Sequence, residues 1–172
     1  MTALARRNAA AVRRGDVGAR AEYLAFTLAK DVYGVRIGEV SEIIRLLPIT
    51  EIPRAPAHVV GVVSVRGRLV TVIDLRLRFS LPASPFDDKT RILLVSASDD
   101  EQVGLLVDEV HQVYRLAEDE IEPAGVLGGE QPAHILGIGR PKAGQQSVRG
   151  EVPKSGELVL VLLDLKPVVE VT

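Results

Sequence analysis

The sequence predicts an all-β fold with short helices, built as two small β-barrels. Hydrophobic residues make up 47% of the 172-residue chain and aromatic residues only 3%, so the core must be built from Val, Leu and Ile, which favour strands. Residues 61–79 contain two β-branched runs separated by Arg66-Gly67-Arg68, a pattern typical of a tight hairpin. A similar motif near the C-terminus indicates a second barrel.

The second copy of this motif relates Gly61 to Gly137 and Asp74 to Asp164. Each copy runs from a glycine-containing apolar stretch to an Asp-Leu pair followed by Arg or Lys. The second copy is longer, and its additional residues coincide with 139–156, a Gly-, Pro-, Lys- and Gln-rich segment that predicts an extended loop. The similarity favours duplication of a short-strand unit, with chance as the open alternative.

The first 20 residues differ in composition from the rest of the chain. They hold five arginines against a single acid, Asp16. We expect a flexible basic tail over 1–20, with 21–172 as the folded domain. A transit peptide and a basic arm that contacts phosphates are the alternatives for the tail. The arginines are Arg6, Arg7, Arg13, Arg14 and Arg20.

Strands are expected on both sides of the central stretch. Before it, 23–28 and 32–37 flank a polar turn and predict one hairpin; after it, 91–97 and 103–107 predict another. The other expected elements are an extended or partly helical segment at 107–113, an acidic turn at 118–123, a short apolar segment at 135–138 and a last strand at 158–165.

A short helix is predicted between the first hairpin and the central stretch. Val40, Ile43, Ile44 and Leu47 follow the i, i+3, i+4, i+7 spacing of one helical stripe, which Pro48 ends. Glu42 would lie opposite that stripe and point towards solvent or a partner. Residues 49–52 can add a short strand.

The second strand of the central hairpin is expected to continue to Phe79. Its period-2 alternation places Asp74, Arg76 and Arg78 on the face that begins with Val70 and Val72. The pattern predicts a strand that leaves the core and ends, on this face, in solvent.

The sequence shows no assembled catalytic, cofactor or metal site. His58, His111 and His134 are far apart and the chain has no cysteine, so the usual spacings of zinc ligands are absent. There is no Gly-x-Ser-x-Gly or Walker motif, and GIGRPKAG at 137–144 has no Ser or Thr after its lysine. We expect no catalysis, no cofactor, no bound metal and no small-molecule substrate.

Charge and hydropathy limit the kinds of partner and the cellular location that can be expected for the protein. The net charge is −2, and basic strands with interleaved aromatics are absent, which argues against nucleic acid as a partner. No apolar run approaches the roughly 20 residues of a membrane span, and no secretory signal is evident. The lack of cysteine fits a reducing compartment, so a cytoplasmic location is expected.

Glu42 and Arg66 are the two charged residues that folding alone leaves unexplained. Each is next to apolar residues at a position expected to be exposed. They are either unrelated surface charges or an ion pair that fixes neighbouring elements at an interaction surface. The spacing leaves both interpretations open.

Three segments together carry a resemblance to the CheW-like coupling proteins of bacterial chemotaxis. They are YLAFTLAKDVYGVRIGEVSEII at 23–44, PRAPAHVVGVVSVRGRLVTVIDLRLRF at 53–79 and RILLVSASDDEQVGLLVDEV at 91–110. The most specific parts are the Tyr-Gly-aliphatic strand before Val-x-Glu-Ile, and Arg-Gly before Val-Ile-Asp-Leu-Arg. The match continues in consistent order from about Tyr23 to Leu165.

The resemblance implies two five-stranded SH3-like barrels packed over a shared hydrophobic seam. It also implies a non-catalytic adaptor, held at receptor arrays on the inner face of the membrane by its partners. Those partners would be the cytoplasmic tips of methyl-accepting chemotaxis proteins and the regulatory domain of a CheA-type histidine kinase. The positions that match the family's partner-binding region are Val40, Glu42, Ile44, Gly61, Arg66 and Gly67, and we expect Val62 and Val65 to add an apolar groove for a helical partner.

Two departures from the family pattern leave alternatives open. Ser64 stands where the family usually has Asn, and the loop at 139–156 is longer than usual. The chain could therefore be a variant that binds receptors but not the kinase. From other classes, a small enzyme that uses the cleft between the barrels and a β-barrel nucleic-acid binder that uses the arginine-rich tail are the rivals.

Overall fold

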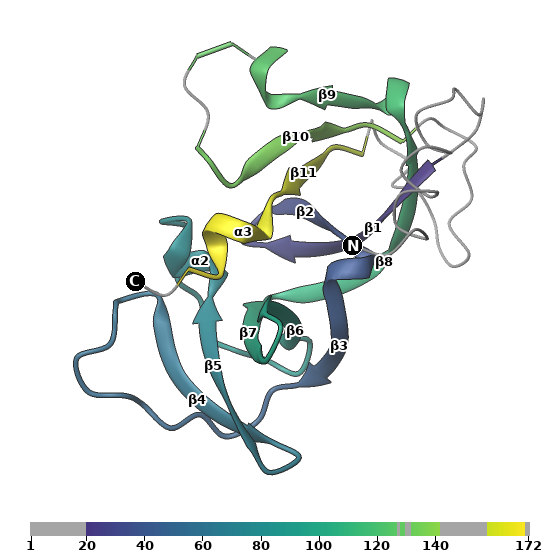
Figure 1. The fold of residues 1–172 in the computed structure, drawn as a ribbon. Coiled ribbons are helices and arrows are strands. Elements are labelled where there is room, and N and C mark those ends of the chain that lie inside the picture. Colours follow the sequence, from purple (N-terminus) through teal and green to yellow (C-terminus); the bar gives the residue numbers. More distant parts are fainter. Residues whose placement is uncertain (1–19, 127, 130–131, 142–157, 171–172) are drawn as a thin grey trace.

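A computed structural model describes residues 20–126, 128–129, 132–141 and 158–170 (Figure 1). Nearly all of the predicted basic tail and most of the predicted loop at 139–156 lie outside these residues. Arg20, assigned above to the tail, begins the first strand. The strands are β1 (Arg20–Leu28), β2 (Asp31–Arg36), β3 (Val40–Arg45), β4 (Val59–Val65), β5 (Arg68–Asp74), β6 (Arg91–Ser98), β7 (Glu101–Val107), β8 (Glu109–Ala117), β9 (Ile121–Pro123), β10 (Ile135–Gly139) and β11 (Leu160–Leu163).

The helical elements are all short. Three are 3-10 turns, η1 (Ile37–Glu39), η2 (Glu118–Glu120) and η3 (Ala124–Val126). Two are single α-turns, α2 (Leu75–Arg78) and α3 (Leu165–Val168), which lie side by side in Figure 1. The all-β prediction with short helices is confirmed.

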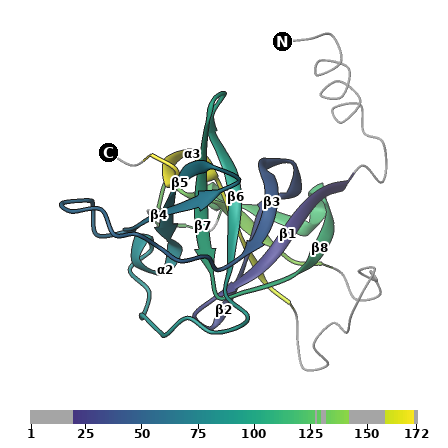
Figure 2. The same ribbon diagram turned by 90° about the horizontal axis from the view of Figure 1, so that it is seen from below.

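The strands form two sheets, seen from two sides in Figures 1 and 2. One sheet has the order β8-β1-β2-β11-β10-β9 and the other β3-β6-β7-β5-β4. In each sheet one parallel pair joins strands distant in sequence, β11 with β2 and β5 with β7. The five strands β8-β1-β2-β11-β10 therefore match β3-β6-β7-β5-β4 in order, and β9 matches an isolated bridge from Thr50 to Val62.

Three hydrophobic clusters explain how the two barrels hold together. One cluster lies inside each barrel, around Val72 and Leu94 in one and around Leu116 and Leu162 in the other. The largest cluster draws on both sheets and includes Phe26 and Leu105. Burial of these aliphatic side chains stabilises each barrel and the contact between them. The predicted shared hydrophobic seam is this third cluster.

The repeat inferred from Gly61 and Gly137 is present in the structure. Each glycine follows a register shift in its hairpin, between Val59 and Gly61 and between Ile135 and Gly137. A Cβ atom on Gly61 would lie 2.1 Å from the Thr50 carbonyl oxygen, and one on Gly137 would lie 2.3 Å from that of Glu122. Both positions need glycine because a neighbouring backbone passes over them.

The repeat extends further upstream than the sequence analysis recognised. Pro-Ala-His precedes both glycine hairpins, at 56–58 and at 132–134. The His58 carbonyl oxygen accepts a hydrogen bond from Asp74 N (2.9 Å), and that of His134 accepts one from Asp164 N (2.8 Å). The two histidines therefore occupy equivalent places in the two barrels.

The helix predicted over 40–47 is wrong, because residues 40–45 form strand β3. A bulge between Val40 and Glu42 shifts its pairing with β6. Val40 consequently packs against the seam cluster, whereas Ile44 packs against the interior of its own barrel. A bulge adds one residue to a period of two, which produces the i, i+3 spacing that imitates a helix.

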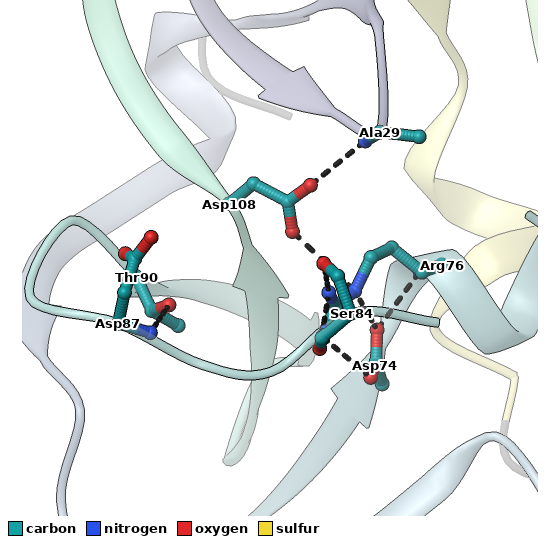
Figure 3. Close-up of polar contacts among 7 residues, drawn as sticks. All are labelled: Ala29, Asp74, Arg76, Ser84, Asp87, Thr90 and Asp108. Carbon is teal, nitrogen blue, oxygen red and sulfur yellow. Dashed lines mark hydrogen bonds and ion pairs between the residues drawn. The ribbon is translucent and has the colours of Figure 1, made fainter. Parts of the chain in front are cut away.

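The strand predicted to reach Phe79 ends at Asp74, where α2 begins. The Asp74 carboxylate accepts a hydrogen bond from Arg76 N (2.9 Å) and so caps the turn. The prediction that the charged end of this strand lies in solvent is also wrong, because Asp74 and Arg76 are buried. Figure 3 shows Arg76 directed back towards Asp74, Ser84 and Asp108 instead.

The remaining sequence predictions agree with the structure to within a few residues. The hairpins β1–β2 and β6–β7 lie where expected. The segment 107–113 is extended, within β7 and β8, and 118–123 holds η2 and β9. The expected strand at 158–165 comprises β11 and the first residue of α3, and 49–52 contributes only the Thr50 bridge.

Candidate partner-binding site

Glu42 and Arg66 form the ion pair that the sequence left open. Arg66 Nη1 donates to Glu42 Oε1 at 3.0 Å, and Arg66 Nη2 pairs with Glu42 Oε2. This bidentate contact joins β3 to the tip of the β4–β5 hairpin. Arg66 and Gly67 both have positive φ, 48° and 81°, as expected for a two-residue hairpin turn of type I′.

The pair stays ionised around neutral pH. The hydrogen bond from Arg66 lowers the pKa of Glu42, and the same bond raises the pKa of Arg66. Both side chains reach solvent, with 72% of Arg66 and 35% of Glu42 exposed. Because water screens an exposed pair, its main effect is to orient two charges on the surface.

The structure separates the other predicted site residues into two groups. Gly67 is exposed at the turn beside Arg66. Val40, Ile44 and Val62 are half-buried and Gly61 and Val65 are buried, so none of these five forms an open apolar surface. The predicted trough built from the 40–44 helix and strand residues Val62 and Val65 is therefore not present.

Two exposed apolar side chains that lie close to Glu42 and Arg66 in the sequence were missed. Ile43, next to Glu42, is 41% exposed, and Leu69, in the arm that follows Arg66 and Gly67, is 76% exposed. The exposure of Leu69 could have been predicted from the sequence, since Leu69 directly follows the hairpin turn Arg66-Gly67-Arg68, which is charged at both ends. That of Ile43 could not, because the predicted helix placed it in the buried stripe, whereas on strand β3 it is exposed.

A second surface feature is a groove of about 760 Å³ between η1–β3, the β6–β7 hairpin and α3. Leu165, Val169 and Ala97 supply its apolar lining, and Ser41 and Ser96 are exposed at its edge. Sequence analysis did not anticipate it, because its walls come from three segments that are distant in the chain. We refer to it as the inter-barrel groove.

The inter-barrel groove is acidic at its rim. Glu39, Glu101 and Glu170 line it together with a single cation, Lys166. Desolvation by the surrounding protein and, next, the charge of Asp164 raise the pKa of Glu39. A cation placed in the groove would offset this repulsion, so the groove favours an apolar partner surface that carries Lys or Arg at its margin.

Among the residues that the structure describes, no group of three or more His, Asp or Glu side chains is arranged to hold a metal ion. None of the helices in that part of the chain is long and apolar enough to cross a membrane.

Comparison with known proteins agrees with the fold. The chemotaxis protein CheW of Klebsiella aerogenes is 35% identical over 103 residues, which cover 60% of this chain and 61% of that protein. The CheW protein of Thermotoga maritima is 27% identical over 150 residues, 87% of each chain. The crystal structure of the scaffolding protein TtCheW from Thermoanaerobacter tengcongensis superposes with a TM-score of 0.72 at 27% identity, covering 89% of this chain and 94% of that one.

The family model for the CheW-like domain matches residues 22–171. That range contains every strand of both barrels except the first two residues of β1. The chain therefore belongs to the CheW-like domain family.

Proposed function

We propose that the protein is a non-catalytic signalling adaptor that couples chemoreceptors to a CheA-type histidine kinase in a chemotaxis or motility pathway. The observation that carries this proposal is a CheW-like double barrel with two separate surfaces suited to protein partners, the inter-barrel groove and the Glu42–Arg66 turn. Relatives named as chemotaxis proteins and a structural neighbour named as a scaffolding protein support it.

The inter-barrel groove is the surface that we assign to the receptor. Chemoreceptor tips are helical hairpins, and an amphipathic helix binds in a groove with an apolar base and a charged rim. Leu165, Val169 and Ala97 provide that base and Glu39 and Glu101 part of that rim. This assignment replaces the trough expected around Val40, Val62 and Val65.

We assign the Glu42–Arg66 turn to a partner contact that depends on both the charges of the pair and the orientation in which the ion pair holds them. The bidentate ion pair fixes the hairpin tip over β3, and Leu69 of the same hairpin adds an exposed apolar side chain. A central apolar contact with an oriented arginine is typical of interface hot spots. The kinase is the partner that we expect here, since two partners bridged by one adaptor need separate surfaces.

Ser41→Arg tests the groove. The added side chain brings bulk to an edge position that is exposed and repels a cationic partner helix, so affinity for a purified receptor-tip fragment should fall about tenfold or more. Isothermal titration calorimetry measures it. Ala57→Arg adds the same side chain at an exposed position outside the groove and should bind normally. Equal affinities for the two variants would contradict the assignment.

Substitutions of Glu42 and Arg66 test the turn. Arg66→Ala should leave the circular dichroism spectrum and melting temperature unchanged, because the pair is exposed, yet weaken binding of the kinase regulatory domain. The double swap Glu42→Arg with Arg66→Glu distinguishes the two roles of the pair. If the double variant binds the kinase domain again, the partner depends on the geometry that the ion pair fixes. If binding stays lost, the partner contacts one of the two charges directly. Wild-type binding by Arg66→Ala would overturn the role given to this turn.

The same binding measurements separate the remaining alternatives. A variant adaptor would bind the receptor fragment but not the kinase domain. Salt-sensitive binding of DNA or RNA, lost on deleting residues 1–20, would instead support the nucleic-acid reading. The enzyme hypothesis would need a convergent set of titratable side chains, and the described lining of the groove offers carboxylates at its rim but no histidine to act with its serines.

A further inference from the structure

The two equivalent histidines of the repeat lie at the junction between the barrels, where each interacts with Arg78. His58 precedes β4 in one sheet and His134 precedes β10 in the other. Both lie near Arg78, at the end of α2, and the ring of His134 stacks on Phe79 with centroids 4.3 Å apart and an interplanar angle of 9°. We call His58, Arg78, Phe79 and His134 the junction cluster.

Arg78 ties this cluster to α3. Its Nη2 donates to the Pro167 carbonyl oxygen at 3.1 Å, which links α2 of one barrel to α3 of the other. Leu165 and Lys166 of α3, and Val169 just after it, line the inter-barrel groove. The hydrogen bond from Arg78 therefore anchors the helix that forms part of the groove wall.

The cluster is incompletely hydrogen-bonded. Arg78 Nε and His58 Nε2 are both buried without a hydrogen-bond partner among the described residues. Buried polar atoms without partners are uncommon in folded proteins and call for an explanation. A proton added to His58 Nε2 would find no acceptor among the described residues and would face the positive charge of Arg78, which also acts on His134.

The nearby carboxylates are already engaged. Asp74 binds Arg76, and Asp164 accepts a hydrogen bond from Lys166 N at 3.1 Å. The Lys166 side chain is exposed, and Arg76 is held by Asp74 and Asp108. Arg78 is thus the charged group that acts on both rings, and it is of the same sign as a protonated histidine.

We propose that the junction cluster is a pH-sensitive switch, in which protonation of His58 and His134 repels Arg78 and weakens its hold on α3. At neutral pH both rings are uncharged, Arg78 bonds Pro167, and the groove wall is fixed. On acidification two further positive charges arise next to Arg78, and the α2–α3 contact loosens. A consequence for partner binding rests on the proposed function of the groove, whereas the switch itself does not.

The electrostatics agree with the geometry. Burial and, after it, the charge of Arg78 lower the pKa of His58 and of His134 from their ordinary value of 6.5. Because the folded state disfavours the protonated form, the stabilisation is complete above pH 6.5. It is lost as the pH falls from there through the lowered pKa values, since the unfolded chain binds the protons more readily.

Thermal melts at several pH values test the switch. Between about pH 7.5 and about pH 5.5 the wild-type melting temperature should fall, and in the double variant His58→Gln, His134→Gln that fall should shrink by roughly half or more. His111→Gln is the matched control, because His111 lies on β8 and bonds Thr27 away from the junction. It should keep the wild-type fall. Equal slopes for the wild type and the double variant would overturn the proposal.

Two measurements follow the switch without any partner. In NMR titrations the midpoints of His58 and His134 should lie below 6.5 and rise in Arg78→Gln. Hydrogen exchange of the Val169 amide, which bonds Leu165 O at 2.9 Å, should speed up at acid pH in the wild type but not in the double variant, after correction for intrinsic rates. Midpoints indifferent to Arg78→Gln, or a Val169 amide equally protected in both proteins, would contradict it. Failure of groove binding with these results intact would refute only the proposed function.

Discussion

Gly61→Ala is expected to lower the free energy of unfolding by about 3 kcal/mol or more. The new Cβ would lie 2.1 Å from the Thr50 carbonyl oxygen and 2.8 Å from Ile49 Cγ2, and the residue has a φ of +149° that side chains disfavour. The backbone of the Thr50 bridge, with its two hydrogen bonds to Val62, would have to move. Urea denaturation followed by circular dichroism measures the loss.

Two further glycines make the comparison specific. Gly137→Ala places a Cβ 2.3 Å from the Glu122 carbonyl oxygen, so the equivalent site in the other barrel should show a similar loss. Gly38→Ala adds a Cβ with nothing within 4 Å and should change stability by less than about 0.5 kcal/mol. A Gly61→Ala protein as stable as Gly38→Ala would show that the backbone at the Thr50 bridge is not fixed against β4.

The glycine repeat also shows what the sequence could predict. Gly61 and Gly137, each with a downstream Asp-Leu pair, were enough to indicate two barrels, because a backbone crossing requires glycine whatever surrounds it. The Arg66-Gly67 turn was likewise predictable, since Gly67 favours positive φ and separates two β-branched runs. Such features are local, so the residues that specify them are adjacent in the chain.

The failures concern features that depend on distant partners. The bulge in β3 arises from its pairing with β6, and no residue type between Val40 and Ile44 predicts it. The groove is assembled from η1, the β6–β7 hairpin and α3. Arg76 was expected in solvent because its strand alternation ends in charge, and its burial depends partly on Asp108, which comes from the β7–β8 connection.

Arg76 is a buried arginine with polar contacts to several segments of the chain (Figure 3). Its Nε lies 3.4 Å from Asp74 Oδ1 and 3.3 Å from Asp108 Oδ1, and its Nη1 donates to the Ser84 carbonyl oxygen at 2.7 Å. Asp108 also accepts a hydrogen bond from Ala29 N at 2.8 Å. The guanidinium therefore connects α2, the 79–90 loop and, through Asp108, the β1–β2 turn of the other barrel.

Arg76→Met should consequently destabilise the protein by about 3–5 kcal/mol, the usual result of removing one partner of a buried ion pair. Methionine fills much of the volume but leaves buried Asp74 and partly buried Asp108 without their cation. Urea denaturation measures the change. Arg115→Ala, which removes the exposed ion pair with Glu22, is the surface control and should cost less than about 1 kcal/mol.

A second substitution distinguishes lost packing from unpaired charge. Asp108→Asn in the Arg76→Met background removes one of the two uncompensated carboxylates while leaving an acceptor oxygen for Ala29 N. If unpaired charge dominates, this double variant should be more stable than Arg76→Met alone. If it is equally unstable or worse, the loss comes from packing and from the released Ser84 loop. An Arg76→Met protein that unfolds with wild-type stability would mean that the link between the barrels through Asp108 contributes nothing, and that the seam cluster alone holds them together.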